Sequence, residues 1–410
     1  MPIYHRQSPD SRKILALLLP LILLLIFPGL PGSAAAGVPP TNVIFLIGDG
    51  MGFEQVKAAG MYLNGAEGTL SFEFLPCQAE MTTHSANSSI TDSAAAATAI
   101  ATGVKVDNDV VSVAIPGDGH ELETLLEYFK TQGKRTGLVT TTNITHATPA
   151  CFGAHETSRS NYSAIAIDYL NQTRPNVLLG GGGDGMSLAS AQTAGYTVVT
   201  NATGILALDT DAVTMVSGQF GTGYMPYEYD GLGSLPHLLE MTETALDILD
   251  NDPDGFFLMV EGGRIDHACH SNDMVRSIFE TIEFAESVQA VVDWGAGRTD
   301  TLILVTADHE TGGLTVVSNN GIGNLPSVSW STTGHTGANV PVYASGVNAE
   351  MVDGVMDNTD LFDVAVSGSD YTGDFDEDGD TDGYDLYKLV IGEQDLGQLN
   401  EFARVFGSIE

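Results

Sequence analysis

Short apolar runs alternate with longer amphipathic segments along most of the chain. The runs at 42–47 and 301–306 are rich in Val, Ile and Leu, which is typical of strands buried in a sheet. Further strands are expected at 136–141, 176–179, 255–260 and 340–346, and helices at 53–63, 91–102, 122–131, 235–249 and 274–292. This alternation predicts an α/β fold, with a mainly parallel central sheet and helices on both of its faces.

Side chains that bind metals follow several of the expected strands. Ligands of such sheets bind beyond the carboxyl ends of the strands, so the residues at those ends matter most for function. Asp49 lies in G-D-G-M-G after the first strand, and His146 and Thr148 lie in T-H-A-T-P after the strand at 136–141. On its own, Asp49 among glycines would also fit an ordinary turn.

The strand at 255–260 is followed by E-G-G-R-I-D-H, which contains Glu261, Asp266 and His267, and then by His270. Asp266 and His270 are four residues apart, which places both on one side of a helix or tight loop. A carboxylate oxygen and an imidazole nitrogen together suit zinc.

A second Asp/His pair, Asp308 and His309, follows the strand at 301–306, and His335 in H-T-G precedes the strand at 340–346. Each of these strands therefore has a metal ligand close to one end. The pattern predicts a site with several metal ions at one edge of the sheet.

Ser93 opens the alanine-rich segment T-D-S-A-A-A-A-T-A. The N-terminus of a helix favours an anion, so a small hydroxyl there can meet a phosphate at close range. The alternative interpretation is that Ser93 or Thr91 is only the N-cap of the helix.

The motifs together resemble the alkaline phosphatase family of metal-dependent phosphomonoesterases, from about residue 42 to about residue 365. The resemblance implies that Ser93 is the nucleophile of a phosphoserine intermediate and that Arg159 binds two phosphate oxygens. It further implies one Zn²⁺ on Asp266, His270 and His335, a second Zn²⁺ on Asp49, Asp308 and His309, and one Mg²⁺ on Asp49, Thr148 and Glu261. It places Asp92, His146 and His267 behind the ligands or beside the phosphate.

His146 and His267 occupy positions that hold Asp and Lys in some members of the family, although other members also carry histidines there. The departure bears on the third metal and on the usual lysine contact to phosphate. The chemistry of the other residues agrees with the implied roles. A metal ion can activate a serine hydroxyl without a general base, and a guanidinium fits a phosphoryl group in bidentate fashion.

Two other functions compete with a phosphomonoesterase. One is a different hydrolase of the same superfamily, such as a sulfatase, a phosphodiesterase or a phosphonate hydrolase. A sulfatase needs its nucleophile in C/S-x-P-x-R, whereas four alanines follow Ser93. The other is an exported component that binds metal or phosphate without catalysis. The full set of nucleophile, arginine and ligands argues against such a relic.

The composition excludes a nucleic-acid-binding surface but not an anionic substrate. The chain has 53 Asp and Glu against 15 Lys and Arg, a formal charge of −38, whereas nucleic-acid binding needs a basic stripe. Three divalent cations would invert the charge locally, so phosphate monoesters remain the expected substrates. Cys77, Cys151 and Cys269 allow at most one disulfide, and we expect buried free thiols.

The first 36 residues have the pattern of a secretory signal. Arg6, Arg12 and Lys13 precede an apolar stretch at 14–27, and a run of small residues at 33–36 offers a cleavage site. The pattern predicts export, to the periplasm or outside the cell, and a catalytic domain over 37–368. A homodimer is a further expectation.

Residues 369–410 are expected to form a small helical calcium-binding segment. The run D-F-D-E-D-G-D-T-D-G-Y-D has the spacing of a calcium loop with a glycine at its sixth position, and resembles half of a dockerin module. The expected Ca²⁺ ligands are Asp374, Asp376, Asp378, Asp380, Asp382 and Asp385. Docking to a cohesin-like or cell-surface partner would follow from this resemblance. The alternative is a solvated acidic tail.

Overall fold

The computed structural model describes residues 39–368. The predicted leader at 1–36 and the predicted calcium-binding segment at 369–410 lie outside the described residues.

In the described part of the chain, a ten-stranded sheet runs through the centre in the order β14-β2-β13-β8-β1-β7-β3-β4-β6-β5. Its pairings are parallel except those of β13, which runs antiparallel to both β8 and β2. The strands are β1 (Asn42–Ile47), β2 (Cys77–Thr82), β3 (Arg135–Asn143), β4 (Val177–Gly181), β5 (Thr197–Val199), β6 (Val216–Gln219), β7 (Phe256–Glu261), β8 (Thr301–Thr306), β13 (Val340–Gly346) and β14 (Val355–Asp357). The predicted mainly parallel sheet is therefore confirmed.

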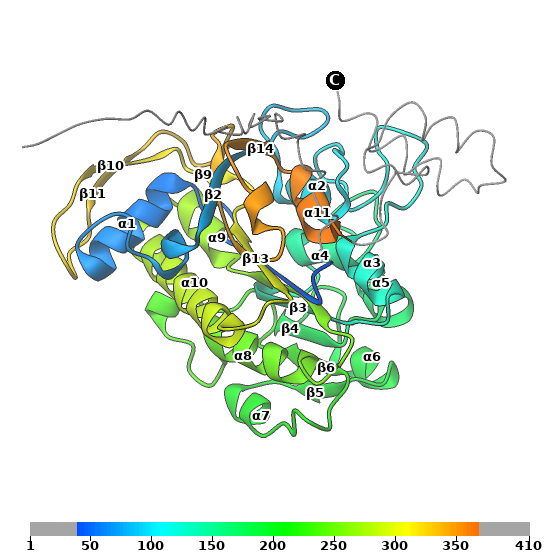
Figure 1. Ribbon diagram of the computed structural model, residues 1–410. Coiled ribbons are helices and arrows are strands. Elements are labelled where there is room, and N and C mark those ends of the chain that lie inside the picture. The colour runs from blue at the N-terminus through cyan, green and yellow to red at the C-terminus, as the bar shows by residue number, and fades with distance from the viewer. Residues whose placement is uncertain (1–38, 369–410) are drawn as a thin grey trace, which may run out of the picture. The chain divides into compact units, whose positions relative to one another are not determined.

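Helices cover both faces of the sheet (Figure 1). One face carries α8 (Leu238–Leu249) and α10 (Met274–Gly295), with α1 (Phe53–Asn64) and α9 (Arg264–His270) packed on α10. The other carries α3 (Leu125–Thr131) and α4 (Ala147–Gly153), with α2 (Ser93–Thr102) on α4, α11 (Asp360–Val366) on α2 and α5 (Tyr162–Asp168) on α4. The short α6 (Leu188–Thr193) and α7 (Ala202–Leu206) pack near β5 and α8.

The four central strands bring their carboxyl ends to one edge. Every residue of β1 is buried, because helices cover both faces of the sheet there. At the end of β1, Ile47 pairs with Glu261 of β7 on one side and with Thr306 of β8 on the other. Thr140 of β3 also pairs with Glu261. The segments that follow β1, β3, β7 and β8 therefore meet in space.

Two small antiparallel sheets lie outside the central one. Strands β10 (Leu314–Ser318) and β11 (Ser327–Trp330) form a hairpin, and β12 (His335–Thr336) pairs with β9 (Glu310–Thr311). The second pairing sets His335 opposite Thr311, next to the segment that follows β8. A residue distant in sequence thus reaches the edge where the central strands end.

Three of the five predicted helices begin later in the structure than the pattern indicates, whereas α1 and α10 begin at the predicted residue. The helix expected from 91 begins at Ser93 after the N-cap Asp92, the one expected from 122 begins after the N-cap Thr124, and the one expected from 235 begins after His237. The N-cap of α2 is therefore Asp92, and neither Thr91 nor Ser93. A capping residue has extended backbone angles, so the apolar pattern alone misplaces the start.

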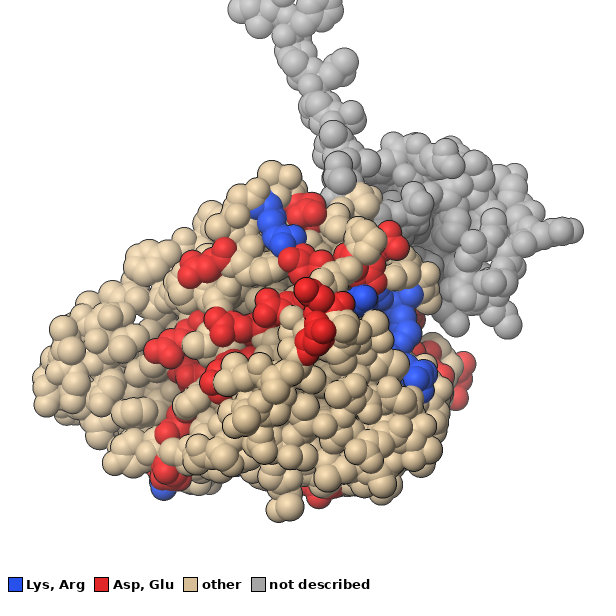
Figure 2. Space-filling view, turned by 90° about the horizontal axis from the view of Figure 1, so that it is seen from below, with Lys and Arg blue, Asp and Glu red and all other residues tan. Residues whose placement is uncertain are grey.

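The surface agrees with the composition. On the face shown in Figure 2, acidic side chains spread over several areas, while Lys and Arg are confined to small ones. Cys77, Cys151 and Cys269 are free, and the last two are buried. Among the described residues, no helix is both long enough and apolar enough to cross a membrane.

Candidate active site

Three groups of potential metal ligands meet at the carboxyl edge of the central sheet. Within each group, the ligand atoms lie within 4.8 Å of one another. The first group is Asp266, His270 and His335, the second is Asp49, Asp308 and His309, and the third is Asp49, His146 and Glu261. The structure thus brings together residues from the ends of β1, β3, β7 and β8 and from β12.

The two histidines of the first group are oriented by backbone carbonyls. His270 Nδ1 donates to the Thr333 carbonyl at 2.6 Å, and His335 Nδ1 donates to the Thr91 carbonyl at 2.9 Å. Because a carbonyl can only accept, each ring carries a proton on Nδ1. The two Nε2 atoms lie 3.2 Å apart. Two neutral rings would face each other with lone pairs, so either a proton on one Nε2 or a shared cation is needed between them.

Asp266 completes this group from the first turns of α9. Its Oδ2 lies 3.2 Å from His270 Nε2 and its Oδ1 lies 3.7 Å from His335 Nε2. Thr311 Oγ1 donates to Oδ1 at 2.5 Å, which fixes the carboxylate plane. Burial raises the pKa of Asp266, but the hydrogen bond from His270 and the nearby histidines outweigh it and hold the pKa well below its usual range.

The second group is fully buried. His309 Nε2 lies 3.3 Å from Asp308 Oδ2 and 3.5 Å from Asp49 Oδ1. Asp308 Oδ1 accepts hydrogen bonds from the backbone N–H groups of Gly50 and His309, at 3.1 and 2.9 Å. Its Oδ2 and both oxygens of Asp49 are buried without a hydrogen-bond partner. Asp49 Oδ1 and Asp308 Oδ2 therefore lie beside the same imidazole nitrogen.

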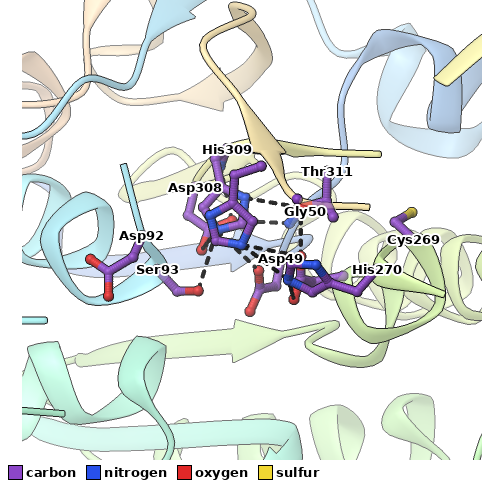
Figure 3. A network of polar contacts seen from close by, with 12 residues as sticks. Asp49, Gly50, Asp92, Ser93, Cys269, His270, Asp308, His309 and Thr311 are labelled. Carbon is purple, nitrogen blue, oxygen red and sulfur yellow. Dashed lines mark hydrogen bonds and ion pairs between the residues drawn. The ribbon is translucent and has the colours of Figure 1, made fainter. Parts of the chain in front are cut away.

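Ser93 reaches this second group from the first residue of α2 (Figure 3). Its Oγ lies 3.2 Å from His309 Nε2. The Oδ1 of the N-cap, Asp92, accepts from the Ala95 N–H at 3.0 Å, which fixes the first turn of the helix. The hydroxyl is thus held beside the metal-ligand cluster and at a helix N-terminus, where a phosphate is favoured.

Arg159 lies between Asp92 and His146. Its Nη1 donates to Asp92 Oδ2 at 2.9 Å and its Nη2 contacts His146 Nε2 at 3.2 Å. A guanidinium can only donate, so His146 accepts at Nε2 and carries its proton on Nδ1. That Nδ1 is buried without a hydrogen-bond partner. Burial and the charge of Arg159 hold the pKa of His146 well below its usual range.

Oxygen atoms dominate the third group. Glu261 Oε2 accepts from Thr140 Oγ1 and, at 3.2 Å, from Thr142 Oγ1, whereas Glu261 Oε1 and Thr148 Oγ1 are buried without a hydrogen-bond partner. Thr148 lies in the first turn of α4, directly after the N-cap region at His146. Carboxylate and hydroxyl oxygens are the ligands that Mg²⁺ prefers.

The protein's own basic groups do not balance the negative charges of the carboxylates in the site. Burial, and then the charges of Asp308, Asp266 and Glu261, raise the pKa of Asp49 well above its usual range. Burial also raises the pKa of Glu261, and it raises the pKa of Asp308 to about 8. Buried oxygens that lack hydrogen bonds and repel one another fit metal cations closely, so the residues present suit bound metal ions.

Some residues around the site carry no signal in the sequence. Thr140, Thr142 and Thr311 bind the ligand carboxylates, yet threonine is common in strands and these three precede or follow the recognisable motifs. Arg264 lies inside E-G-G-R-I-D-H, and its Nη1 is 2.7 Å from His267 Nδ1. Tyr224, from the loop after β6, lies against His267 with ring centroids 4.4 Å apart.

Comparison with known proteins gives one consistent result. The model of the alkaline phosphatase family matches residues 40–187, 171–326 and 324–367. The chain is 33% identical to alkaline phosphatase 3 of Bacillus subtilis over 78% of this chain and 87% of that protein. It is 34% identical to streptomycin-6-phosphate phosphatase of Streptomyces griseus, over 79% and 89%, and 31% identical to alkaline phosphatase of Escherichia coli, over 79% and 85%.

Solved structures show the same similarity. Alkaline phosphatase from the Antarctic bacterium TAB5 superposes with a TM-score of 0.71 at 28% identity, covering 80% of this chain and 97% of that one. The Thermus thermophilus enzyme gives a TM-score of 0.72 at 25% identity, covering 82% and 93%. A TAB5 variant with Mg bound in its M3 site gives 0.70 at 28% identity, covering 80% and 97%.

Proposed function

The chain belongs to the alkaline phosphatase family and is a phosphatase, and on that basis we propose that it hydrolyses phosphate monoesters through a phosphoserine intermediate on Ser93. One observation carries the proposal. Ser93 Oγ lies 3.2 Å from His309 Nε2, beside buried carboxylate oxygens that lack hydrogen bonds. The hydroxyl is therefore adjacent to a cation-binding cluster, and Asp92, the residue before Ser93, also binds the Arg159 guanidinium.

The chain's own residues divide into metal ligands and groups that handle the phosphate. Asp266, His270 and His335 would hold one zinc ion, and Asp49, Asp308 and His309 the other. Asp49, Thr148 and Glu261 would hold magnesium. Bound zinc supplies Lewis acidity, which lowers the pKa of a hydroxyl or a water molecule and stabilises a leaving oxygen.

Arg159 binds two non-bridging phosphate oxygens and is held in place by Asp92. Ser93 Oγ then attacks phosphorus in line, so that the Ser–O–P bond forms while the bond between phosphorus and the alcohol oxygen breaks. The serine proton ends on the alcohol. Water cleaves the phosphoserine in a second displacement, returns a proton to Ser93 and releases inorganic phosphate.

His146 would be a hydrogen-bond donor, and not a ligand, at the third metal position. With Nε2 accepting from Arg159, its proton is on Nδ1, which is buried without a hydrogen-bond partner, and the ring belongs to the group formed with Asp49 and Glu261. A protonated nitrogen cannot ligate a metal, but it can donate a hydrogen bond to a neighbouring oxygen. Magnesium in this chain would therefore rely on Asp49, Thr148 and Glu261, with His146 behind them.

We also propose that the protein is exported, on the basis of the residue pattern at 1–36, and that the segment after 368 binds Ca²⁺. Metal analysis of the full chain and of a chain ending at Tyr371 tests the second point, because the truncation should remove calcium and leave zinc. The homodimer and the docking to a cohesin-like partner stay predictions.

Turnover of p-nitrophenyl phosphate and of its bis ester tests the proposed function. We expect strong preference for the monoester, because Arg159 and the metal ions neutralise a dianion. Ser93→Ala should lose on the order of 10³-fold or more in kcat while the protein keeps its zinc. Preference for the diester, or full activity of Ser93→Ala, would refute the assignment.

A further inference from the structure

Arg264 and His267 lie three residues apart at the start of α9, on one side of the helix. Arg264 Nη1 lies 2.7 Å from His267 Nδ1. A guanidinium has donors and no acceptor, so this contact is a hydrogen bond only when Nδ1 is unprotonated. The neutral ring then carries its proton on Nε2.

Arg264 is itself held in place on two sides. Its guanidinium lies over the ring of Tyr227 at 3.8 Å from the centroid, and 5.5 Å from the centroid of Tyr224. Its backbone N–H donates to Thr141 Oγ1 at 3.2 Å. Planar stacking of a guanidinium on an aromatic ring leaves its edge free to donate in a fixed direction.

His267 lies next to His146, the histidine that contacts Arg159. It directly follows the ligand Asp266, and its ring is 5.7 Å from that of His146, which accepts from Arg159. Tyr224 covers the ring of His267 from another side, with centroids 4.4 Å apart. The residue is half-buried, so it is partly accessible from outside the protein.

The two histidines thus have opposite tautomers, each set by an arginine. Arg159 contacts Nε2 of His146, whereas Arg264 contacts Nδ1 of His267. His146 then carries its proton on Nδ1, which is buried without a partner, and His267 carries its proton on Nε2, the nitrogen that does not contact its arginine. His146 is therefore associated with the third group of ligands, and the Nε2–H of His267 remains free to donate to a substrate.

We propose that Arg264 is a positioning residue that fixes His267 as an Nε2–H donor to a phosphoryl oxygen, with Tyr227 and Tyr224 holding the pair in place. The role rests on the proposed function, because it assumes that Arg159 binds the phosphate. It gives this chain a neutral donor where a lysine would bring a full charge, and the donor's direction depends on the arginine.

Nitrogen NMR of the full-length, metal-loaded protein with ¹⁵N-labelled histidine tests the tautomer directly. His267, identified by its loss in His267→Gln, should show an acceptor-type Nδ1 and a protonated Nε2. In Arg264→Gln the two nitrogens should shift toward a mixture, and Arg264→Lys should restore much of the original pattern. A protonated Nδ1 in the unmodified protein would overturn the proposal.

Kinetics of p-nitrophenyl phosphate and inhibition by inorganic phosphate test the consequence. Arg264→Gln should raise KM and the phosphate inhibition constant about tenfold, the expected size for one charge-assisted contact, and change kcat less. In the His267→Gln background the same substitution should add little, because the two residues act as one unit. Full additivity of the two substitutions would contradict the proposal.

Arg276→Gln is the matched control, because Arg276 also lies over Tyr227, at 5.2 Å, but binds Asp230 and Asp273. It removes the same charge without touching His267, so it should leave KM and the histidine spectrum unchanged. Equal effects of Arg264→Gln and Arg276→Gln would reduce the role to net charge and overturn the proposal. If the unmodified protein shows the proposed tautomer of His267 but does not hydrolyse p-nitrophenyl phosphate, the result would count against the proposed function instead.

Discussion

Single residues in the site are defined by atoms that lack partners. The facing Nε2 atoms of His270 and His335 and the bare oxygens of Asp49 each carry a cost in the absence of a cation. The same atoms are ideal ligands once a cation is present. Hydrogen bonds that the two histidines donate to the Thr91 and Thr333 carbonyls fix the directions of the rings beforehand, and a hydrogen bond from Thr311 does the same for Asp266.

His155 predicts a pH dependence of stability away from the metal site. Its Nε2 lies 3.0 Å from Glu127 Oε1 and its Nδ1 lies 2.9 Å from the Ser112 carbonyl. Burial lowers the pKa of His155, but Glu127 and the carbonyl outweigh it and raise the pKa to about 9. A raised histidine pKa stabilises the fold below the unfolded value of about 6.5, and this gain is lost as pH rises through about 9.

Urea unfolding at about pH 6 and about pH 9.5 measures this effect under saturating metal. The unmodified protein should lose about 1–3 kcal/mol more between the two pH values than His155→Gln does, as a shift of this size implies. Identical pH slopes for the two proteins would show that the pair contributes nothing.

Residue types in the site were predictable, but their atomic roles were not. The spacing of Asp266 and His270 already placed both on one side of α9. His335 is 65 residues from His270, and its orientation depends on the Thr91 carbonyl, which no motif reveals. Tautomers depend on partners from other segments, so sequence spacing cannot specify them.

At the scale of elements, the start of α2 links Ser93, the proposed nucleophile, to Arg159, the residue proposed to bind phosphate. Asp92 is its N-cap, and the two oxygens of this one side chain have separate partners. Oδ1 accepts from the N–H groups of Ala95 and Asp109, and Oδ2 accepts from Arg159. The position of Ser93 and that of Arg159 are therefore coupled through the start of one helix.

Two substitutions at Asp92 should separate these functions. Asn caps helices as well as Asp does, so Asp92→Asn should stay within about 0.5 kcal/mol of the unmodified stability, while Asp92→Ala should lose about 1 kcal/mol. Both remove the charge that holds Arg159, so both should raise the phosphate inhibition constant several-fold. Thermal denaturation and phosphate inhibition measure the two effects. Unchanged phosphate affinity in Asp92→Asn would contradict the coupling.

The elements that could be predicted were those with a strong apolar pattern. The apolar runs of β1 and β8 match their predicted bounds, because strands buried on both faces are continuous apolar segments. The pattern gave no strand at β2, whose C-Q-A-E-M-T is only partly buried, nor at the three-residue β5 and β14. Their place in the sheet comes from pairing, of β2 with β13 and β14 and of β5 with β6.

For the whole molecule, the acidic residues behind the charge of −38 lie in two places, the buried candidate site and the surface. The buried carboxylates of Asp49, Glu261, Asp266 and Asp308 repel one another across the carboxyl ends of the central strands. Metal ions of about six positive charges in total would reverse the sign there. The site can therefore attract a phosphate although the chain as a whole is strongly acidic.

Metal removal should consequently destabilise the whole domain, and more so at high pH. Without a cation, the pKa of Asp308 is raised to about 8, so the folded metal-free protein loses stability as pH rises from the unfolded pKa of about 4 through about 8. The difference in melting temperature between metal-loaded and chelator-treated protein should widen between about pH 6 and about pH 9. His155 titrates in both the metal-loaded and the metal-free protein, so its contribution cancels in the difference between their melting temperatures. A gap that stays constant or narrows would contradict this account.

The account's central claim is that Ser93 carries the phosphoryl group during turnover. Acid quenching of the full-length, zinc-loaded protein during hydrolysis of p-nitrophenyl phosphate, followed by peptide mass spectrometry, tests it most directly. We predict one added phosphoryl group on the peptide that contains Ser93, located on that serine and absent from Ser93→Ala. Turnover without phosphorylation of any residue, or with the phosphoryl group on another side chain, would contradict the claim.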